Sequence, residues 1–123
     1  MNITRLAFIV ALAFTSQFAF SQTQKNNKMN LKDLHKDSIG VQTNMMFPAT
    51  DGKVISLQIF KGSQLKEHIT KVSALLICVK GNAVYEDEKG IKANLFSGDF
   101  VKIEPNVKHW VDGIEDSNLL LIK

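Results

Sequence analysis

The chain of 123 residues is long enough for one domain and too short for two of ordinary size. Its fifteen Lys and Arg residues are scattered singly among twelve acidic residues, so the net charge of +3 does not form the clustered footprint of a nucleic-acid-binding protein. A single cysteine excludes an internal disulfide, and an apolar core must therefore stabilise the fold.

Residues 1–21 have the pattern of a secretory signal peptide. Arg5 precedes the apolar run Leu6–Phe14, and the small residues Ala19 and Ser21 occupy the positions that a signal peptidase reads. An uncleaved membrane anchor is the alternative, but a spanning helix needs about 20 apolar residues and this run is shorter. We therefore expect cleavage after Ser21, a secreted or periplasmic protein, and no membrane attachment of the mature chain.

The next segment, residues 22–40, has the composition of a flexible leader, because its first part is polar and rich in Asn, Gln and Lys. One short helical turn is expected within it, with Leu31 and Leu34 on one side and an end at Gly40. His35 also lies here. We expect its side chain to be exposed, since no other chemical group of the sequence converges on it.

From residue 41 to the C-terminus, the pattern is that of short β-strands separated by turns. Apolar and β-branched runs alternate with turn pairs such as Asp51-Gly52 and Asp112-Gly113, and no segment shows a convincing 3.6-residue period. This pattern predicts an all-β domain over residues 41–123, an antiparallel β-sandwich or small barrel. The predicted strands are the runs 54–60, 73–80, 83–87, 91–96, 99–105, 109–111 and 118–123.

The run 74–80 is apolar on both of the faces that a strand presents. These faces consist of Ala74, Leu76 and Cys78 and of Leu75, Ile77 and Val79. Such a strand is either central in the domain or has one face against a partner subunit. Cys78 is expected to be a buried free thiol rather than a reactive one. Trp110 points away from the face of its neighbour His109, and with the doubly apolar strand it predicts a homodimer.

Glycines and histidines recur at a particular spacing in two segments. Gly62 is followed after five residues by His68, and Gly98 precedes His109 in the second segment. This spacing resembles the two motifs of the cupin family, and the resemblance covers the whole predicted β domain. It implies a single cupin domain, a jelly-roll barrel. Asn106 replaces a motif glycine, and we expect it at a turn with positive φ, which Asn tolerates.

The resemblance also implies an interior metal cup of three histidines and one carboxylate, which suits iron, manganese, nickel or zinc. This chain has only His68 and His109 of that set, because Thr70 replaces the second histidine and Ala74 replaces the carboxylate. The main expectation is therefore a cup without a resident metal. A divalent metal held by His68 and His109, with Cys78 as a third ligand, is the alternative.

Three functions are compatible with this sequence. The first is an exported module that binds an unidentified small molecule, with Leu76 and Cys78 lining the barrel and His68, Thr70 and His109 fixing the ligand's orientation. The second is a cupin-type enzyme, a dioxygenase, isomerase or lyase, in which His68 and His109 transfer protons. The third is a structural role as a homodimer, which can coexist with the first. The substitutions Thr70 and Ala74 tell against metal-dependent oxygenase chemistry.

Overall fold

A computed structural model describes residues 25–35 and 43–123 of the chain. The expected signal peptide, residues 22–24 and residues 36–42 lie outside the described residues. Within the described part, no helix is long and apolar enough to cross a membrane. Two antiparallel sheets make up nearly all of the regular structure, which confirms the predicted all-β fold class.

The described residues form nine β-strands and one short 3₁₀ helix. They are β1 (Met29–Asn30), η1 (Leu31–Leu34), β2 (Val54–Ile59), β3 (Gln64–His68), β4 (Ala74–Lys80), β5 (Asn82–Asp87), β6 (Lys92–Phe96), β7 (Asp99–Ile103), β8 (His109–Gly113) and β9 (Ser117–Ile122). The expected helical turn is present as η1. Strands β1 and β3 lie outside the predicted runs.

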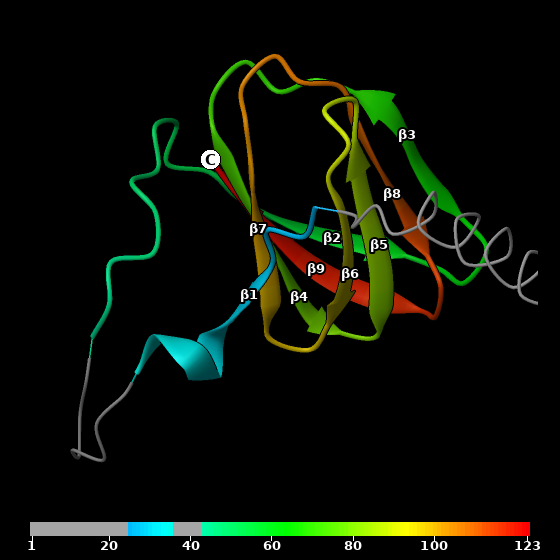
Figure 1. Cartoon of the computed structure of the whole chain (residues 1–123), viewed down its shortest axis with the longest axis horizontal. Helices are drawn as coiled ribbons and strands as arrows, with labels where there is room; N and C mark the ends of the chain where they lie inside the picture. Colours follow the sequence, from blue (N-terminus) through cyan, green and yellow to red (C-terminus); the bar gives the residue numbers. More distant parts are fainter. Residues whose placement is uncertain (1–24, 36–42) are drawn as a thin grey trace, which may run out of the picture.

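The strands are arranged in two sheets that face each other (Figure 1). One sheet has the order β1-β7-β4-β9-β2, and the other has the order β3-β8-β5-β6. Every strand pair is antiparallel. From β2 to β9 the chain passes from one sheet to the other at every connection except the β5–β6 hairpin. This alternation is the topology of a jelly roll, as predicted.

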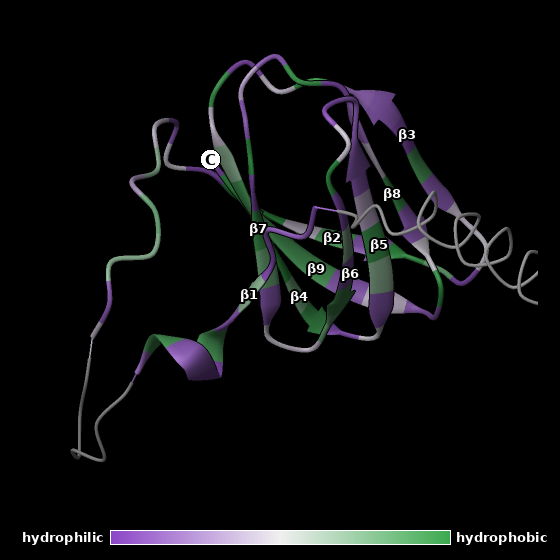
Figure 2. Cartoon of the chain, viewed as in Figure 1, coloured by the Kyte–Doolittle hydropathy of each residue, from purple (hydrophilic) through white to green (hydrophobic). Residues whose placement is uncertain are grey.

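The main hydrophobic core lies between the two sheets. Strand β4 contributes Ala74, Leu76 and Cys78, all at most 1% exposed, and the four-stranded sheet contributes residues such as Tyr85 and Val111. Figure 2 shows that β4 is hydrophobic along most of its length, whereas β3 is largely hydrophilic. This difference fits a central strand that is buried on both faces and an edge strand that has only one face on the core.

The second apolar face of β4 lies on the outside of the five-stranded sheet and is covered by the same chain. Leu75 is 1% exposed and Ile77 is 9% exposed. The residues packed against this face include Leu34 of η1 and Met46 and Phe47 of the segment before β2. A partner subunit is therefore not needed to bury Leu75 and Ile77.

The described part of the segment expected to be a flexible leader contains the strand β1 and the helix η1. We refer to residues 25–31 as the N-terminal strap. Its strand β1 pairs with β7, so that Met29 lies opposite Phe100. Lys25 forms an isolated bridge with Ile91, the residue just before β6 of the other sheet. The strap thus links the two sheets: it forms the edge strand beside β7 in one sheet and contacts the residue before the edge strand β6 of the other. Composition alone does not reveal this long-range pairing.

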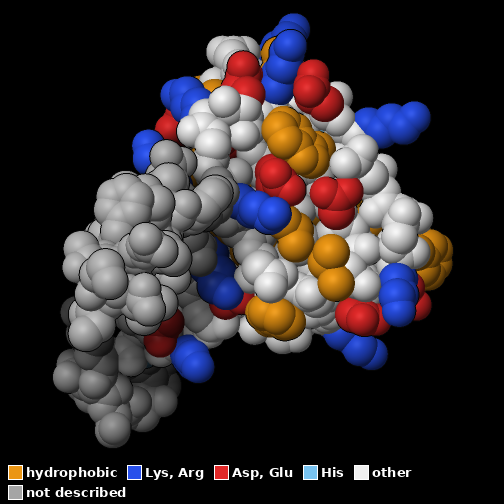
Figure 3. All heavy atoms as spheres, turned by 45° about the vertical axis from the view of Figure 1, so that its right-hand side comes forward, with side chains coloured by type: hydrophobic (Ala, Val, Ile, Leu, Met, Phe, Trp, Pro, Cys, Tyr) orange, Lys and Arg blue, Asp and Glu red, His pale blue; other side chains and the backbone are white. Residues whose placement is uncertain are grey.

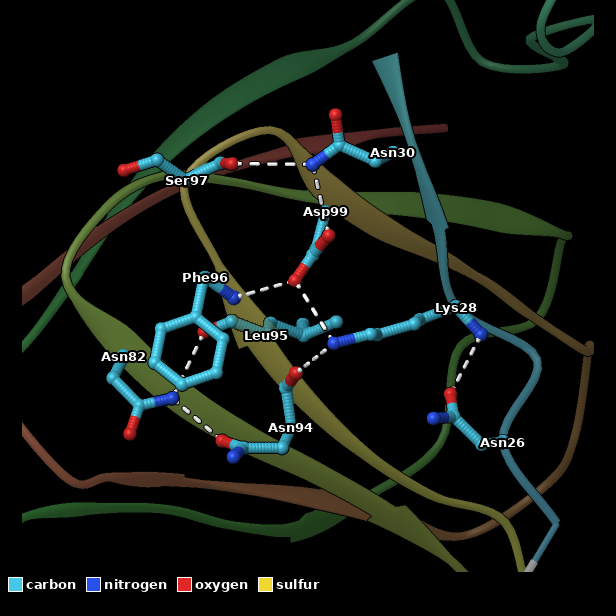
Figure 4. Close-up of polar contacts among 9 residues, drawn as sticks. All are labelled: Asn26, Lys28, Asn30, Asn82, Asn94, Leu95, Phe96, Ser97 and Asp99. Carbon is cyan, nitrogen blue, oxygen red and sulfur yellow. Dashed lines mark hydrogen bonds and ion pairs between the residues drawn. The ribbon is translucent and has the colours of Figure 1, made fainter. Parts of the chain in front are cut away.

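The buried carboxylate of Asp99 ties the strap to the turn between β6 and β7 (Figure 4). Asp99 accepts hydrogen bonds from the Asn30 side chain at 2.9 Å and from the Phe96 amide at 2.8 Å, and the Lys28 ammonium lies 3.2 Å away. Lys28 also donates to the carbonyl of Asn94 at 2.9 Å. Burial raises the pKa of Asp99, but these three contacts outweigh it and hold the pKa below its usual value.

Candidate binding cup

The two motif histidines meet inside the barrel. His68 ends β3 and His109 begins β8, and the two residues are direct partners in the antiparallel register. Their ring centroids lie 4.3 Å apart, with a 58° angle between the ring planes. His109 is 1% exposed, whereas His68 is half-buried. The structure therefore brings together the two residues on which the cupin resemblance depends.

A β-bulge in β3 places the ring of His68 on the same side of the sheet as that of His109. Leu65 lies opposite Val111, but His68 lies opposite His109, so three steps along β3 match two steps along β8. In a regular strand, Leu65 and His68 would point to opposite faces. The extra residue lets Leu65 pack against the core while His68 still contacts His109.

Both imidazole rings are anchored in the same way. The Nδ1 atom of His68 lies 2.8 Å from the carbonyl oxygen of Lys66, and that of His109 lies 3.0 Å from the carbonyl oxygen of Val107. A carbonyl only accepts, so each Nδ1 carries the proton and donates it. Within the described part of the chain, neither Nε2 atom has a hydrogen-bond partner. The two Nε2 atoms are the free hydrogen-bonding positions of the pair.

Two residues that the sequence analysis did not single out complete this site. The Tyr85 ring stacks on His109 with a centroid distance of 5.8 Å, and its hydroxyl donates to Asp87 at 3.0 Å. Asp87 lies directly opposite His109 in the β5–β8 register. Its other carboxylate oxygen accepts from the amides of Lys89 and Ile91. The alternating pattern of β5 could have indicated that Tyr85 and Asp87 share a face. We refer to His68, His109, Tyr85 and Asp87 as the cup.

Thr70 has a structural role at the edge of the cup. It is 6% exposed, and its hydroxyl donates to the carbonyl of Val72 at 2.9 Å. Its own carbonyl accepts from the amide of Asn106 at 2.7 Å. Asn106 has a φ of 62°, which confirms the expected turn with positive φ. Thr70 therefore connects the segment after β3 to the turn before β8, while its hydroxyl proton is donated to the nearby carbonyl of Val72.

Leu76 and Cys78 lie on the interior face of β4, within the main hydrophobic cluster. Both are fully buried. The Cys78 thiol contacts the carbonyl of Lys80 at 3.7 Å. Burial, together with the negative charge of Asp99, raises the pKa of this thiol, so Cys78 stays protonated at neutral pH. This is the environment of a buried free thiol, as the sequence analysis expected.

Burial also affects the charge state of His109. It lowers the pKa of His109 below its ordinary value, and His68 acts in the same direction, while the contacts with Val107 and Asp87 oppose this effect. His109 is therefore a neutral imidazole near neutral pH. Burial and the charges of Asp87 and Glu104 raise the pKa of Tyr85 far above its ordinary value, so the phenol keeps its proton.

The described residues do not supply the metal ligands that the cupin resemblance implies. No group of three or more His, Cys, Asp or Glu side chains in residues 25–35 and 43–123 is arranged to hold a metal ion. Asp87 is the carboxylate opposite His109, but both of its oxygens are hydrogen-bonded elsewhere. Ala74 has no donor atom, and Cys78 lies in the apolar core. Two imidazoles are one protein ligand short of an ordinary catalytic zinc site.

A cavity of about 370 Å³ adjoins the cup at Asp87. The strap contributes Lys25 and Asn27 to its wall, and Lys89 and Glu104 also line it. The Lys89 ammonium and the Glu104 carboxylate form an exposed ion pair at 2.6 Å. Asp87 thus belongs both to the cup and to the wall of a polar cavity with several charged residues.

Comparisons with known proteins identify the fold. No family model and no curated protein matches the sequence. Among solved structures, a cupin-like protein from Thermotoga maritima is 23% identical and has a TM-score of 0.51, over 57% of this chain and 55% of its own. The fold is that of the cupins.

Two further cupin-fold structures give the same result. A cupin superfamily protein from Desulfitobacterium hafniense is 18% identical, with a TM-score of 0.51 over 63% of this chain and 82% of its own. A predicted oxalate decarboxylase from Thermotoga maritima is 17% identical, with a TM-score of 0.51 over 56% of this chain and 62% of its own. Alignment with the first Thermotoga protein spans little more than half of that protein. Likeness at this level of identity concerns the fold and not the chemistry.

Proposed function

We propose that this chain is an exported cupin-fold protein that binds a small molecule in the cup through His68 and His109. The observation that carries this proposal is the contact between the His68 and His109 rings, 4.3 Å apart between centroids, whose Nε2 atoms have no hydrogen-bond partner among the described residues. No buried side-chain nitrogen or oxygen in the described part of the chain lacks a partner, so the Nε2 atom of His109 is open to solvent and a small molecule can reach it. The adjacent ring of His68 offers a second such atom to the same molecule.

The surface supports a small molecule rather than a nucleic acid as the partner. On the face shown in Figure 3, lysines and acidic side chains are intermixed, with apolar patches between them. Ion pairs such as Lys89–Glu104 and Lys108–Glu67 neutralise some of these lysines. An intermixed surface does not provide the one-sided positive field that attracts a phosphate backbone.

Export is the second part of the proposal, and the position of the strap in the sequence is compatible with it. Cleavage after Ser21 would leave the whole strap, which starts at Lys25, in the mature protein. Mass spectrometry of the protein exported by its native host should show a chain that begins at Gln22. Retention of Met1–Ser21 in that sample would instead support the uncleaved anchor.

Binding in the cup is tested by side-chain NMR on the mature chain. The chain has three histidines, and the exposed His35 lies outside the cup, so it serves as an internal reference. A set of small neutral, cationic and anionic fragments should shift the imidazole signals of His68 and His109 together and leave that of His35 unchanged. If every fragment leaves both cup signals in place, or shifts only backbone signals elsewhere, the proposal is wrong.

Proton-transfer catalysis is a second candidate, and the neutral state of buried His109 favours it, because a neutral imidazole can accept a proton. Dihydroxyacetone is a suitable probe, since a base that removes its α-proton lets deuterium enter from D₂O. The α-proton signal should then be lost with the wild type and kept with variants that lack either His68 or His109. That result would support an isomerase or lyase. Binding without exchange would support the binding module.

A further inference from the structure

The cup presents hydrogen-bond acceptors to a ligand and few donors. Each Nδ1–H of the histidine pair is already donated to a backbone carbonyl, at Lys66 and at Val107. A neutral imidazole has one donor nitrogen and one acceptor nitrogen. The Nε2 atoms of His68 and His109 therefore each offer a lone pair and no proton.

The hydroxyl groups beside the pair do not change this balance. A hydroxyl has one proton to donate, and Tyr85 gives its proton to the Asp87 carboxylate. Thr70 gives its proton to the carbonyl of Val72. The groups that face His109 from neighbouring strands are His68 from β3 and Tyr85 and Asp87 from β5. None of these groups is a cation when the histidines are neutral, and Asp87 carries a negative charge.

We propose that the cup selects ligands by their hydrogen-bond donors, either the hydroxyl groups of a polyol or an ammonium group, and discriminates against carboxylates and phosphates. This inference rests on the proposed binding function and specifies its ligand class. Two neighbouring donors on one ligand can satisfy the two Nε2 atoms, whose rings are 4.3 Å apart between centroids. An anion would bring acceptors toward acceptors and a negative charge toward Asp87, and each unpaired acceptor would cost binding free energy.

The cavity beyond Asp87 has mixed charge. Lys25, Lys89 and Lys102 line it together with Asp87 and Glu104, and Lys89 is paired with Glu104. An anion bound near Lys25 or Lys102 would therefore be held weakly and away from the histidine pair. An experiment on ligand class must therefore report on the histidine rings themselves. The ¹⁵N signal of a neutral Nε2 provides this report, because it shifts when the atom accepts a hydrogen bond.

Three small probes separate the possibilities on the unmodified mature chain. Ethylene glycol carries neutral donors, ethylammonium carries a cationic donor, and acetate is an acceptor only. The titrations are run at about pH 8, above the ordinary histidine pKa of about 6.5, with EDTA present to remove metal ions. Ethylene glycol or ethylammonium should shift the Nε2 signals of His68 and His109, and acetate should leave both in place. The donor probe that binds with the higher affinity identifies the ligand class as hydroxyl or ammonium.

The possible outcomes distinguish this inference from the proposed function. Shifts of both Nε2 signals by acetate as large as those by the donor probes would overturn donor selection and leave binding in the cup intact. No shift with any probe would overturn both donor selection and binding in the cup.

A matched pair of variants adds a second measurement. His68→Phe should lower the affinity for the donor probe roughly tenfold, the order of one net hydrogen bond, whereas His35→Phe should leave that affinity unchanged. Equal affinity of the His68→Phe variant and the wild type would also overturn the inference.

Discussion

Lys28 of the N-terminal strap lies 3.2 Å from the buried carboxylate of Asp99, at the start of β7. The same carboxylate accepts hydrogen bonds from Asn30 of the strap and from the Phe96 amide. One side chain thus connects the strap to the turn between β6 and β7, where the chain passes from one sheet to the other. Its charge state should affect the stability of the whole fold.

Asp99→Asn is expected to lower the free energy of unfolding by about 1–3 kcal/mol at neutral pH, because the variant loses hydrogen bonds to a charged acceptor. The folded pKa of Asp99 is lowered, so its contribution is present above the unfolded value of about 3.9 and is lost as the pH falls through the folded pKa. Urea unfolding at about pH 7 and about pH 3 should show that the difference from wild type shrinks in acid. The exposed carboxylate variant Asp51→Asn is the control. A difference that is equal at both pH values would contradict this account.

Protonation of the buried His109 should destabilise the fold. The folded pKa lies below the ordinary value, so the unfolded chain binds more protons between the folded pKa and about 6.5, and stability falls as the pH is lowered through that window. An NMR titration should place the midpoint of His109 below 6.5. The unfolding free energy of His109→Gln should depend less on pH in this window than that of the wild type. A midpoint at or above the ordinary value would refute the predicted shift.

Zinc should bind the wild-type chain weakly, since two imidazoles lack at least one protein ligand of a usual site. Thr70→His combined with Ala74→Glu should restore the four-ligand set implied by the cupin resemblance and tighten zinc binding by orders of magnitude. Ala74 is fully buried, so an unpaired glutamate there should destabilise the variant, and zinc should reverse that loss. Calorimetric titration and thermal unfolding with and without zinc measure both effects. One zinc equivalent bound at nanomolar affinity by the wild type would show that a third ligand exists.

We also propose that the chain forms a homodimer through the outer face of the five-stranded sheet. Val54 is 66% exposed and Val79 is 51% exposed, so apolar surface remains there after the chain has covered Leu75 and Ile77. Trp110 belongs to β8 in the other sheet, and one two-fold interface does not readily include both faces. Sedimentation at micromolar concentration should give twice the monomer mass for the wild type.

A pair of variants identifies the face that the dimer uses. Val79→Lys should shift the chain to the monomer, because a charge would enter an apolar interface. Trp110→Ser should leave the dimer intact. A wild type that is monomeric under these conditions would rule out the proposed association, and dissociation by Trp110→Ser alone would move the interface to the other sheet.

Local patterns in the sequence were enough to determine the fold class and most of the strands. Runs such as 54–60 and 91–96 correspond to β2 and β6, because alternation and turn chemistry depend on neighbouring residues only. Asn106 adopts the positive φ expected of it for the same reason. The spacing of His68 and His109 also indicated correctly that the two residues would meet.

The remaining features depend on partners that are distant in the sequence. The bulge in β3, which turns His68 inward, is a relation of register to β8 and leaves no local signal. Asp87 reaches the cup because β5 pairs with β8 in one particular register. The polar composition of residues 25–31 predicts a flexible segment and gives no sign of the strap's pairing with β7 or of its contacts with Asp99. The sequence alone therefore indicated the barrel and its two histidines, while long-range pairing decided which side chains surround them and which segments cover the outer face of β4.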